Sequence, residues 1–207
     1  MSSKRRVVVT GLGIVSPLGN DLETTWKNIL NGESGAARIT KFDASDFSTT
    51  FAAELKGYDD ISGLTQKETR RIDPFVQYAL TASDQAITDA NLALENLDTK
   101  RIGVSIGSGI GGLGSIEDNS IILKEKGPKK ISPFFVPGAI INMASGNVAI
   151  KYNLQGPNIS IVSACSSAGH SIGYSARTIS YGDADIMITG GSEAGITPLG
   201  LAGFNAS

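Results

Sequence analysis

The sequence contains a single cysteine, Cys165, which lies between an apolar run and a helical pattern. The run Ile159 to Val162 is typical of a buried strand, and the helical pattern begins at about Ser166. A side chain at such a corner faces the carboxyl end of a sheet. The helix start favours a thiolate, and the backbone N–H at the corner can stabilise an oxyanion. Cys165 is therefore a candidate nucleophile.

The residues around Cys165 leave a second interpretation open. A lone cysteine in a globular protein is often only a small buried apolar residue. His170, the one histidine of the chain, follows five residues later, roughly 140° around the expected helix. This placement is poor for a base acting on Cys165, so we expect a packed, hydrogen-bonded histidine. A mechanism that requires two histidines cannot be completed by these residues alone.

Two glycine-rich turns suggest a nucleotide site, but neither fits one. The turn Gly11-Leu12-Gly13 lacks the third glycine of a dinucleotide fingerprint, because Ser16 stands there. The turn from Gly107 to Gly112 lacks the Lys-Ser or Lys-Thr of a phosphate-binding loop. We interpret both as tight turns and expect the second to form a pocket wall.

Positive charge is concentrated in two clusters of this chain, whose net charge is only −2. They comprise Lys67, Arg70 and Arg71, and then Lys124, Lys126, Lys129 and Lys130. Solvated surface charge is the ordinary explanation of such clusters. The alternative is a docking patch for an acidic partner.

The elements that position these residues alternate between strands and helices. Strands are expected at 6–14, 101–106, 157–162 and 184–189, and helices at 20–31, 73–91, 115–130, 144–152 and 166–181. Residues 33–66 suggest irregular structure with short strands, and residues 131–141 suggest an apolar loop. This alternation predicts an α/β fold with a mostly parallel sheet.

The helix expected at 166–181 has an unusual pattern. Ala168, Ile172, Ala176 and Ile179 share one face, and no charged face opposes them. We expect this helix to be buried on most sides, as a helix between two sheets would be.

Composition excludes several classes of protein. Hydrophobic residues make up 41% and charged residues 18%, which indicates a globular chain. The small net charge gives no case for nucleic-acid binding. One cysteine and the lack of an apolar run near 18 residues lead us to expect a soluble cytoplasmic protein with no membrane span.

Five segments resemble the β-ketoacyl-[acyl carrier protein] synthases, most closely the type II elongating enzymes. The segments are RRVVVTGLGIVSPLG (5–19), GSGIGGL (107–113), KISPFFVP (130–137), SACSSAGHSIG (163–173) and YGDADIMITGGSEAGITPLGLAGF (181–204). The resemblance implies a thiolase-like fold, with two similar halves stacked as five α-β-α-β-α layers, and a homodimer. Residues 1–207 would form the N-terminal half.

The resemblance also implies roles for individual residues. Cys165 matches the nucleophile that holds the acyl chain as a thioester, and its own N–H would supply half of the oxyanion hole. Ile110 and Phe204 match residues of the acyl pocket, and Phe135 matches one that reaches the pocket across the dimer interface. The carrier-protein docking surface is matched by Lys67, Arg70, Arg71, Lys129 and Lys130. No metal or organic cofactor is implied.

Family members are about twice as long as this chain. Two histidines, a lysine and a gating phenylalanine of the family lie in the half beyond residue 207. Two alternatives therefore stay open: a thiolase-like acyltransferase that uses coenzyme A, and a non-catalytic half-domain that binds acyl carrier protein or acts as a scaffold.

Overall fold

The computed structural model describes residues 5–58 and 63–207. Its centre is a parallel three-stranded sheet in the order β4-β3-β5, formed by Asn158–Ile159, Ile102–Gly107 and Ile186–Gly191. The middle strand β3 pairs with β5 over its whole length and with β4 at two residues. Every residue of β3 is buried. The predicted α/β arrangement with a parallel sheet is confirmed.

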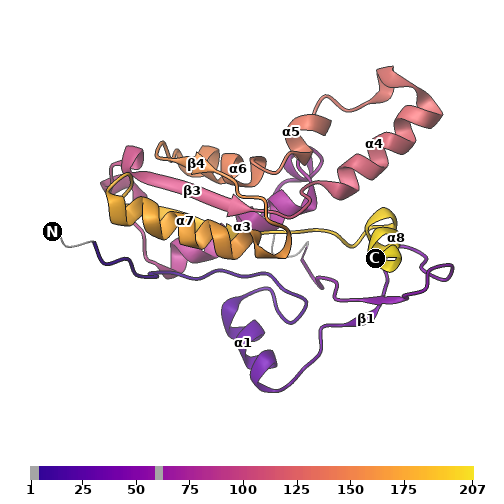
Figure 1. Cartoon of the computed structure of the whole chain (residues 1–207), viewed down its shortest axis with the longest axis horizontal. Helices are drawn as coiled ribbons and strands as arrows, with labels where there is room; N and C mark the ends of the chain where they lie inside the picture. Colours follow the sequence, from indigo (N-terminus) through magenta and orange to yellow (C-terminus); the bar gives the residue numbers. More distant parts are fainter. Residues whose placement is uncertain (1–4, 59–62) are drawn as a thin grey trace.

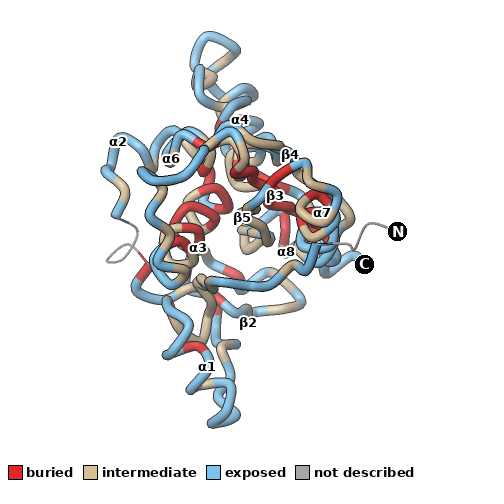
Figure 2. The backbone as a smooth tube through the Cα atoms, turned by 90° about the vertical axis from the view of Figure 1, so that its left-hand side faces the viewer, coloured by how far each residue is buried: buried red, intermediate tan, exposed pale blue. Residues whose placement is uncertain are grey.

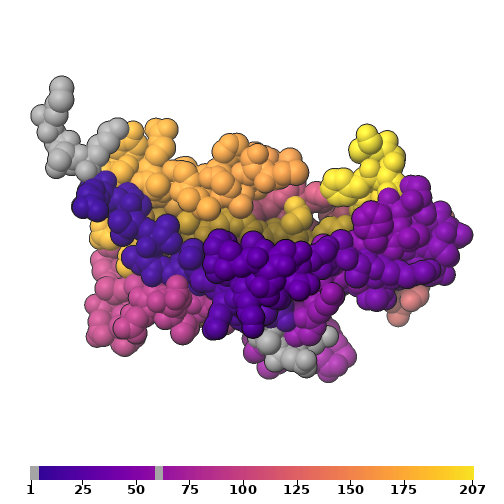
Figure 3. All heavy atoms as spheres, turned by 90° about the horizontal axis from the view of Figure 1, so that it is seen from below, coloured from indigo at the N-terminus to yellow at the C-terminus, as the bar shows by residue number. Residues whose placement is uncertain are grey.

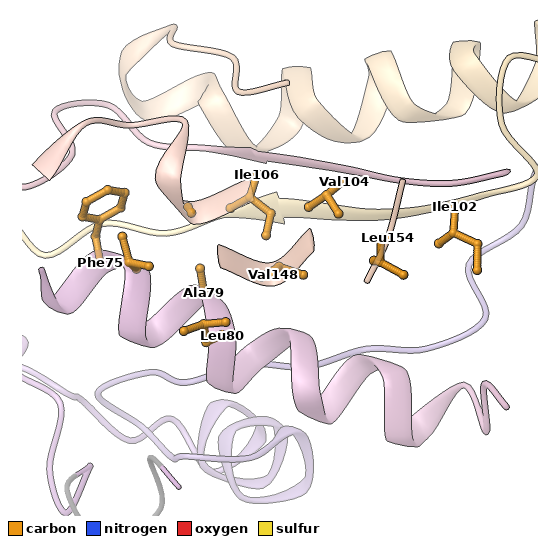
Figure 4. Packing of buried hydrophobic residues seen from close by; sticks show 10 residues of the cluster. Phe75, Ala79, Leu80, Ile102, Val104, Ile106, Val148 and Leu154 are labelled. Atoms are coloured by element: carbon orange, nitrogen blue, oxygen red, sulfur yellow. The ribbon is translucent and has the colours of Figure 1, made fainter. Parts of the chain in front are cut away.

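Helices cover both faces of this sheet (Figures 1 and 2). Helix α7 (Ser167–Tyr181) lies on one face, and α3 (Pro74–Asp89) and α6 (Met143–Tyr152) lie on the other. The main apolar core fills the space between β3 and the pair α3 and α6 (Figure 4). It is built around the fully buried side chains Phe75, Val76, Val104, Ala144 and Val148, together with Ala79, Leu80, Ile102, Ile106 and Leu154.

Local signals set the ends of these helices where the sequence predicts them. Asp73 caps α3 by accepting the N–H of Phe75, and Pro74 occupies the first turn, where its missing N–H costs nothing. Asn153 ends α6 and Gly182 ends α7, each with a left-handed backbone.

The remaining elements surround this centre. They are α1 (Leu22–Leu30), β1 (Ala37–Arg38), β2 (Phe51–Ala52), α2 (Gln66–Thr69), η1 (Leu94–Asn96), η2 (Thr99–Arg101), α4 (Leu113–Lys126), η3 (Pro128–Lys130), α5 (Phe135–Ala139), η4 (Ala164–Ser166) and α8 (Pro198–Ala206). Within the described ranges, none of the helices has the length and apolar character needed to span a membrane.

Neither the strand expected within residues 6–14 nor the tight turn expected at Gly11-Leu12-Gly13 is present. The segment is extended and runs along the underside of the molecule, seen in indigo in Figure 3. Its Leu12 and Ile14 N–H groups donate to Asp89 and Gln85 on α3. A strand requires a neighbouring strand for its backbone hydrogen bonds, and no described strand lies beside this segment. Val9 is consequently 75% exposed.

Two further expectations need correction. Residues 131–141, expected as a loop, contain the short helix α5. The strand expected at 157–162 ends at Ile159, because the Ser145 hydroxyl of α6 is inserted between it and β3. This hydroxyl accepts the N–H of Ile106 at 2.8 Å and donates to the Ile159 carbonyl at 2.9 Å, replacing a direct bond between the strands.

The buried face of α7 also differs from the prediction. Ser167, Ser171, Ser175 and Thr178 face the sheet, whereas Ile172 is 49% exposed. Small side chains let the helix approach closely, and a Cβ built on Gly191 of β5 would stand only 2.6 Å from that of Ala168. Helix α7 is therefore buried on its serine-lined side, whereas Ile172 of the expected apolar face is exposed and Ala168, Ala176 and Ile179 are partly buried.

Candidate active site

Cys165 lies at the predicted corner between the sheet and α7. It occupies the 3₁₀ turn η4, which leads directly into the helix, and its side chain is exposed. The preceding residue, Ala164, has a φ of +52°, a conformation that is unfavourable for a residue with a Cβ. Such strain occurs mostly at functional sites, where the surroundings hold it in place. The corner thus presents the thiol at the carboxyl end of the sheet.

The hydroxyl of Ser167 holds this corner. It accepts the N–H of Ser163 at 2.9 Å and donates to the carbonyl of Ala164 at 2.7 Å. Within the described chain, neither the thiol nor the N–H of Cys165 makes a hydrogen bond. The backbone N–H therefore remains available to an oxyanion, as an oxyanion hole requires.

His170 does not serve the thiol. Its Nδ1 lies 2.6 Å from the hydroxyl of Ser163, so the expected hydrogen bond exists. The expected packing does not, because the imidazole is exposed on the open side of α7.

Three loops meet at the carboxyl end of the sheet, because the parallel strands β3, β4 and β5 all end there. Gly107 shows how close they come: a Cβ built on it would stand 2.6 Å from the Ile161 carbonyl and 2.9 Å from the Ser167 Cβ. A larger residue at this position would separate the loop after β3 from the cysteine corner.

Glu193 is a site residue that the sequence analysis missed. It follows β5, and its carboxylate accepts hydrogen bonds from the loop Ser108–Gly111. Glu193 comes just after Gly190-Gly191 at the end of β5, and the glycine-rich loop after β3 has backbone N–H groups that can bind a carboxylate. This combination could have identified Glu193 from the sequence. The loop at 107–112 bends sharply, with Gly111 in a left-handed backbone, and its donors bind the protein's own carboxylate; the pocket wall expected there stays a prediction.

The expected acyl-pocket residues come from three separate elements. Ile110 belongs to the loop that contacts the corner, Phe135 begins α5, and Phe204 lies on α8. Ile110 is 41% and Phe204 is 68% exposed. A hollow of about 140 Å³ opens beside Glu193 and is lined also by Val15, Tyr78 and Ile196, but not by Cys165 or these three residues.

The expected docking residues lie on neighbouring elements. Lys67, Arg70 and Arg71 belong to α2 and the turn after it, and Lys129 and Lys130 belong to η3; all five are exposed. None of them forms an ion pair with a described residue. The Arg71 guanidinium lies 4.7 Å from the ring centroid of Phe134, four residues beyond Lys130. This contact joins the two clusters.

The described residues include no group of three or more His, Cys, Asp or Glu side chains placed to hold a metal ion. Cys165 itself offers an exposed thiol beside a backbone N–H that no described residue binds, at a helix start.

Comparison with known proteins agrees with this architecture. A 3-oxoacyl-[acyl-carrier-protein] synthase 2 of Coxiella burnetii is 55% identical over 98% of this chain. One from Vibrio cholerae is 52% identical over 99%, and one from Staphylococcus aureus is 47% identical over the whole chain. The chain spans about half the length of these relatives, 49%, 50% and 50%.

Solved structures give the same fold. The ishigamide ketosynthase/chain length factor superposes with a TM-score of 0.90 at 25% identity, covering 99% of this chain and 51% of that one. A type II polyketide synthase acyl-carrier protein in complex with its ketosynthase gives a TM-score of 0.81 at 25% identity, with 99% and 55% covered. The fold is therefore that of the thiolase-like ketosynthases. Residues 4–207 match the family described as "Beta-ketoacyl synthase, N-terminal domain", and the chain belongs to that family.

Proposed function

We propose that the polypeptide carrying this chain elongates fatty acyl chains by decarboxylative Claisen condensation. Its acyl substrate is held as a thioester on Cys165, and its second substrate is malonyl-[acyl carrier protein]. The observation that carries this proposal is the exposed Cys165 thiol at a strained sheet-to-helix corner, with its own N–H unpaired. Relatives of 47–55% identity are named 3-oxoacyl-[acyl-carrier-protein] synthase 2, which supports the choice of reaction.

In the first half of the reaction, the Cys165 sulfur attacks the acyl carbonyl carbon of an acyl thioester. The Cys165 N–H stabilises the negative oxygen of the tetrahedral intermediate. The bond to the carrier's sulfur then breaks, the carrier leaves as a thiolate that takes up a proton from solvent, and the acyl group remains on Cys165.

In the second half, malonyl thioester loses CO2, and the resulting carbanion attacks the carbonyl carbon of the acyl-cysteine. A carbon–carbon bond forms, and the Cys165 sulfur leaves as a thiolate, so the enzyme is regenerated. The groups that assist decarboxylation are expected in the second half of the polypeptide.

The proposed partner is acyl carrier protein, bound on the patch formed by α2, the turn after it and η3. Unpaired basic side chains suit an acidic surface, and the contact between Arg71 and Phe134 keeps the two clusters together. A similar solved ketosynthase is titled as a complex with its acyl-carrier protein, which supports this assignment.

We also propose that a C-terminal half and a second copy of the chain cover the apolar surface left open here. Ile172 on α7, Val9 in the N-terminal segment and Trp26 on α1 are each about half exposed or more. Patches of this kind mark interaction surfaces. Under this proposal residues 1–207 are the N-terminal half of a cytoplasmic homodimeric enzyme, and Phe135 reaches the partner's acyl pocket.

The test uses the complete natural polypeptide and acyl-[acyl carrier protein]. Intact-mass spectrometry should show the protein gaining one acyl group, and malonyl-[acyl carrier protein] should then remove it as a 3-oxoacyl product. Cys165→Ala should gain nothing, whereas the matched neighbour variant Ser166→Ala should be acylated. Carrier-protein binding without an adduct on the wild type would contradict the proposal and favour the scaffold alternative. Equal acylation by acyl-coenzyme A in charge-reversed variants of the basic patch would favour the coenzyme A alternative.

A further inference from the structure

The loop after β3 closes around a carboxylate from a distant part of the chain. Glu193 Oε2 accepts the N–H groups of Gly109 at 2.7 Å and Ile110 at 3.0 Å. Oε1 accepts the Ser108 hydroxyl at 3.0 Å and the Gly111 N–H at 3.3 Å. Successive N–H groups of a turn form a concave anion site, and here Gly111 adopts the required left-handed backbone with φ +82°. The anion in this site is Glu193.

The same loop touches the cysteine corner at two points. The hydroxyl of Ser167, which holds the corner, also lies 3.3 Å from the Ser108 carbonyl. Its single proton serves mainly the nearer carbonyl of Ala164, at 2.7 Å. A Cβ built on Gly109 would stand 3.4 Å from the Cα of Ala164, the strained residue beside Cys165. The loop therefore packs directly on the backbone that aims the thiol.

These contacts connect Glu193, through the loop after β3, to the corner that carries Cys165. We propose that Glu193 is a positioning residue: its carboxylate fixes the loop, and the loop fixes both Cys165 and the acyl-facing Ile110. The acyl-transfer part of this inference rests on the proposed function, whereas the coupling between loop and corner does not. Charge-assisted hydrogen bonds are the strong ones, so one carboxylate with four donors can hold a glycine-rich loop that has little stiffness of its own.

Glu193→Gln is the sharpest perturbation, because it keeps the length of the side chain. The glutamine amide has only one acceptor oxygen, and its NH2 group faces other hydrogen-bond donors. Some of the loop's donors therefore lose their acceptor. Glu95→Gln is the matched control, because Glu95 is exposed on η1 and its side chain bonds to no described residue.

The experiment compares these variants in the complete polypeptide by three measurements. They are acyl transfer to Cys165 from carrier-bound chains of several lengths, alkylation of Cys165 by iodoacetamide, and hydrogen exchange of peptides covering 106–113 and 160–168. Glu193→Gln should slow acyl transfer about 10- to 100-fold, since small misplacements of a reacting group have effects of this size. Alkylation of Cys165 needs no aligned acyl group, so its rate should change less than about threefold. Exchange should rise in both peptides.

The outcomes separate positioning from folding. Faster exchange confined to 106–113, or acyl transfer and alkylation falling by the same factor, would overturn the inference. If Glu193→Gln fails to fold, Ser167→Ala is used instead, because it removes the hydroxyl that connects the corner to the loop. This variant should raise hydrogen exchange in 160–168 but not in 106–113. If the wild type takes up no acyl group, the proposed function is wrong. The hydrogen-exchange measurements would still test whether the loop and the cysteine corner are coupled.

Discussion

Replacing Ser145 by alanine tests how the sheet holds the segment that leads to Cys165. The hydroxyl of Ser145 is fully buried between β3 and β4. It accepts the Ile106 N–H at 2.8 Å and donates to the Ile159 carbonyl at 2.9 Å. In Ser145→Ala the methyl group still keeps the strands apart, so both backbone groups lose their partner. The edge strand should therefore loosen just before the cysteine corner.

The expected size follows from these lost contacts. A buried donor left without a partner costs about 1–3 kcal/mol. The Ile159 carbonyl is only partly buried and can turn to water, so we expect a loss of about 2 kcal/mol in the free energy of unfolding. The measurement is urea denaturation of the complete polypeptide at one fixed protein concentration, because association also affects apparent stability.

The control is Ser180→Ala, which removes a hydroxyl that donates to the Arg177 carbonyl near the end of α7. This site is open to water, so the change should stay within about 0.5 kcal/mol. A loss below about 0.5 kcal/mol in Ser145→Ala, with an unchanged denaturant slope, would refute the reasoning. It would mean that the Ile106 N–H finds another partner, and that the inserted hydroxyl is not what holds β4.

Three further predictions concern charge and packing. The pKa of Asp185 is lowered to about 2 by its hydrogen bonds and ion pairs with Arg101 and Arg5. Its contribution to stability is therefore present above its unfolded pKa of about 4 and is lost as pH falls toward 2. Asp185→Asn should therefore flatten the acid limb of an unfolding profile between about pH 4 and 2. Phe75→Ala empties the fully buried centre of the core and should cost about 3–5 kcal/mol in thermal or chemical unfolding. Reversing the charges of Arg70 and Arg71 should weaken carrier-protein binding about tenfold at low salt in titration calorimetry, and less at high salt.

Each of these changes has a matched control. Asp46→Asn removes an exposed carboxylate that forms no ion pair with any residue that the structure describes, and should leave the acid limb unchanged. Phe51→Ala removes a ring that is 62% exposed and should cost far less than the core substitution. Charge reversal at the exposed Lys100, which belongs to η2 and not to the basic patch, should leave carrier binding intact. If a control variant showed the same effect as its test variant, the reasoning behind that prediction would be wrong.

Local patterns predicted the elements whose signals lie within a few residues. Asp73-Pro74 marked the start of α3, and Gly182 marked the end of α7. The apolar runs identified β3 and β5, because a strand buried on both faces is continuously apolar. The turn at Cys165 followed from the same reasoning, since small residues between a strand and a helix indicate a tight corner.

Contacts between distant segments decided the rest. Residues 6–14 have a strand-like sequence, but no described strand lies beside them, so α3 takes their hydrogen bonds. Helix α7 has an apolar side, yet its serines face the sheet, because only small side chains allow so close an approach. The hydrogen bond that Glu193 accepts from the Gly109 N–H spans 84 positions of sequence, which no local pattern reveals. The sequence by itself identified the candidate nucleophile, Cys165, and the type of each central element, whereas only the tertiary structure decided which groups hold that cysteine in place. The physical reason is that helix ends and strand runs are set by neighbouring residues, while hydrogen-bond partners at a sheet edge depend on which loops meet there.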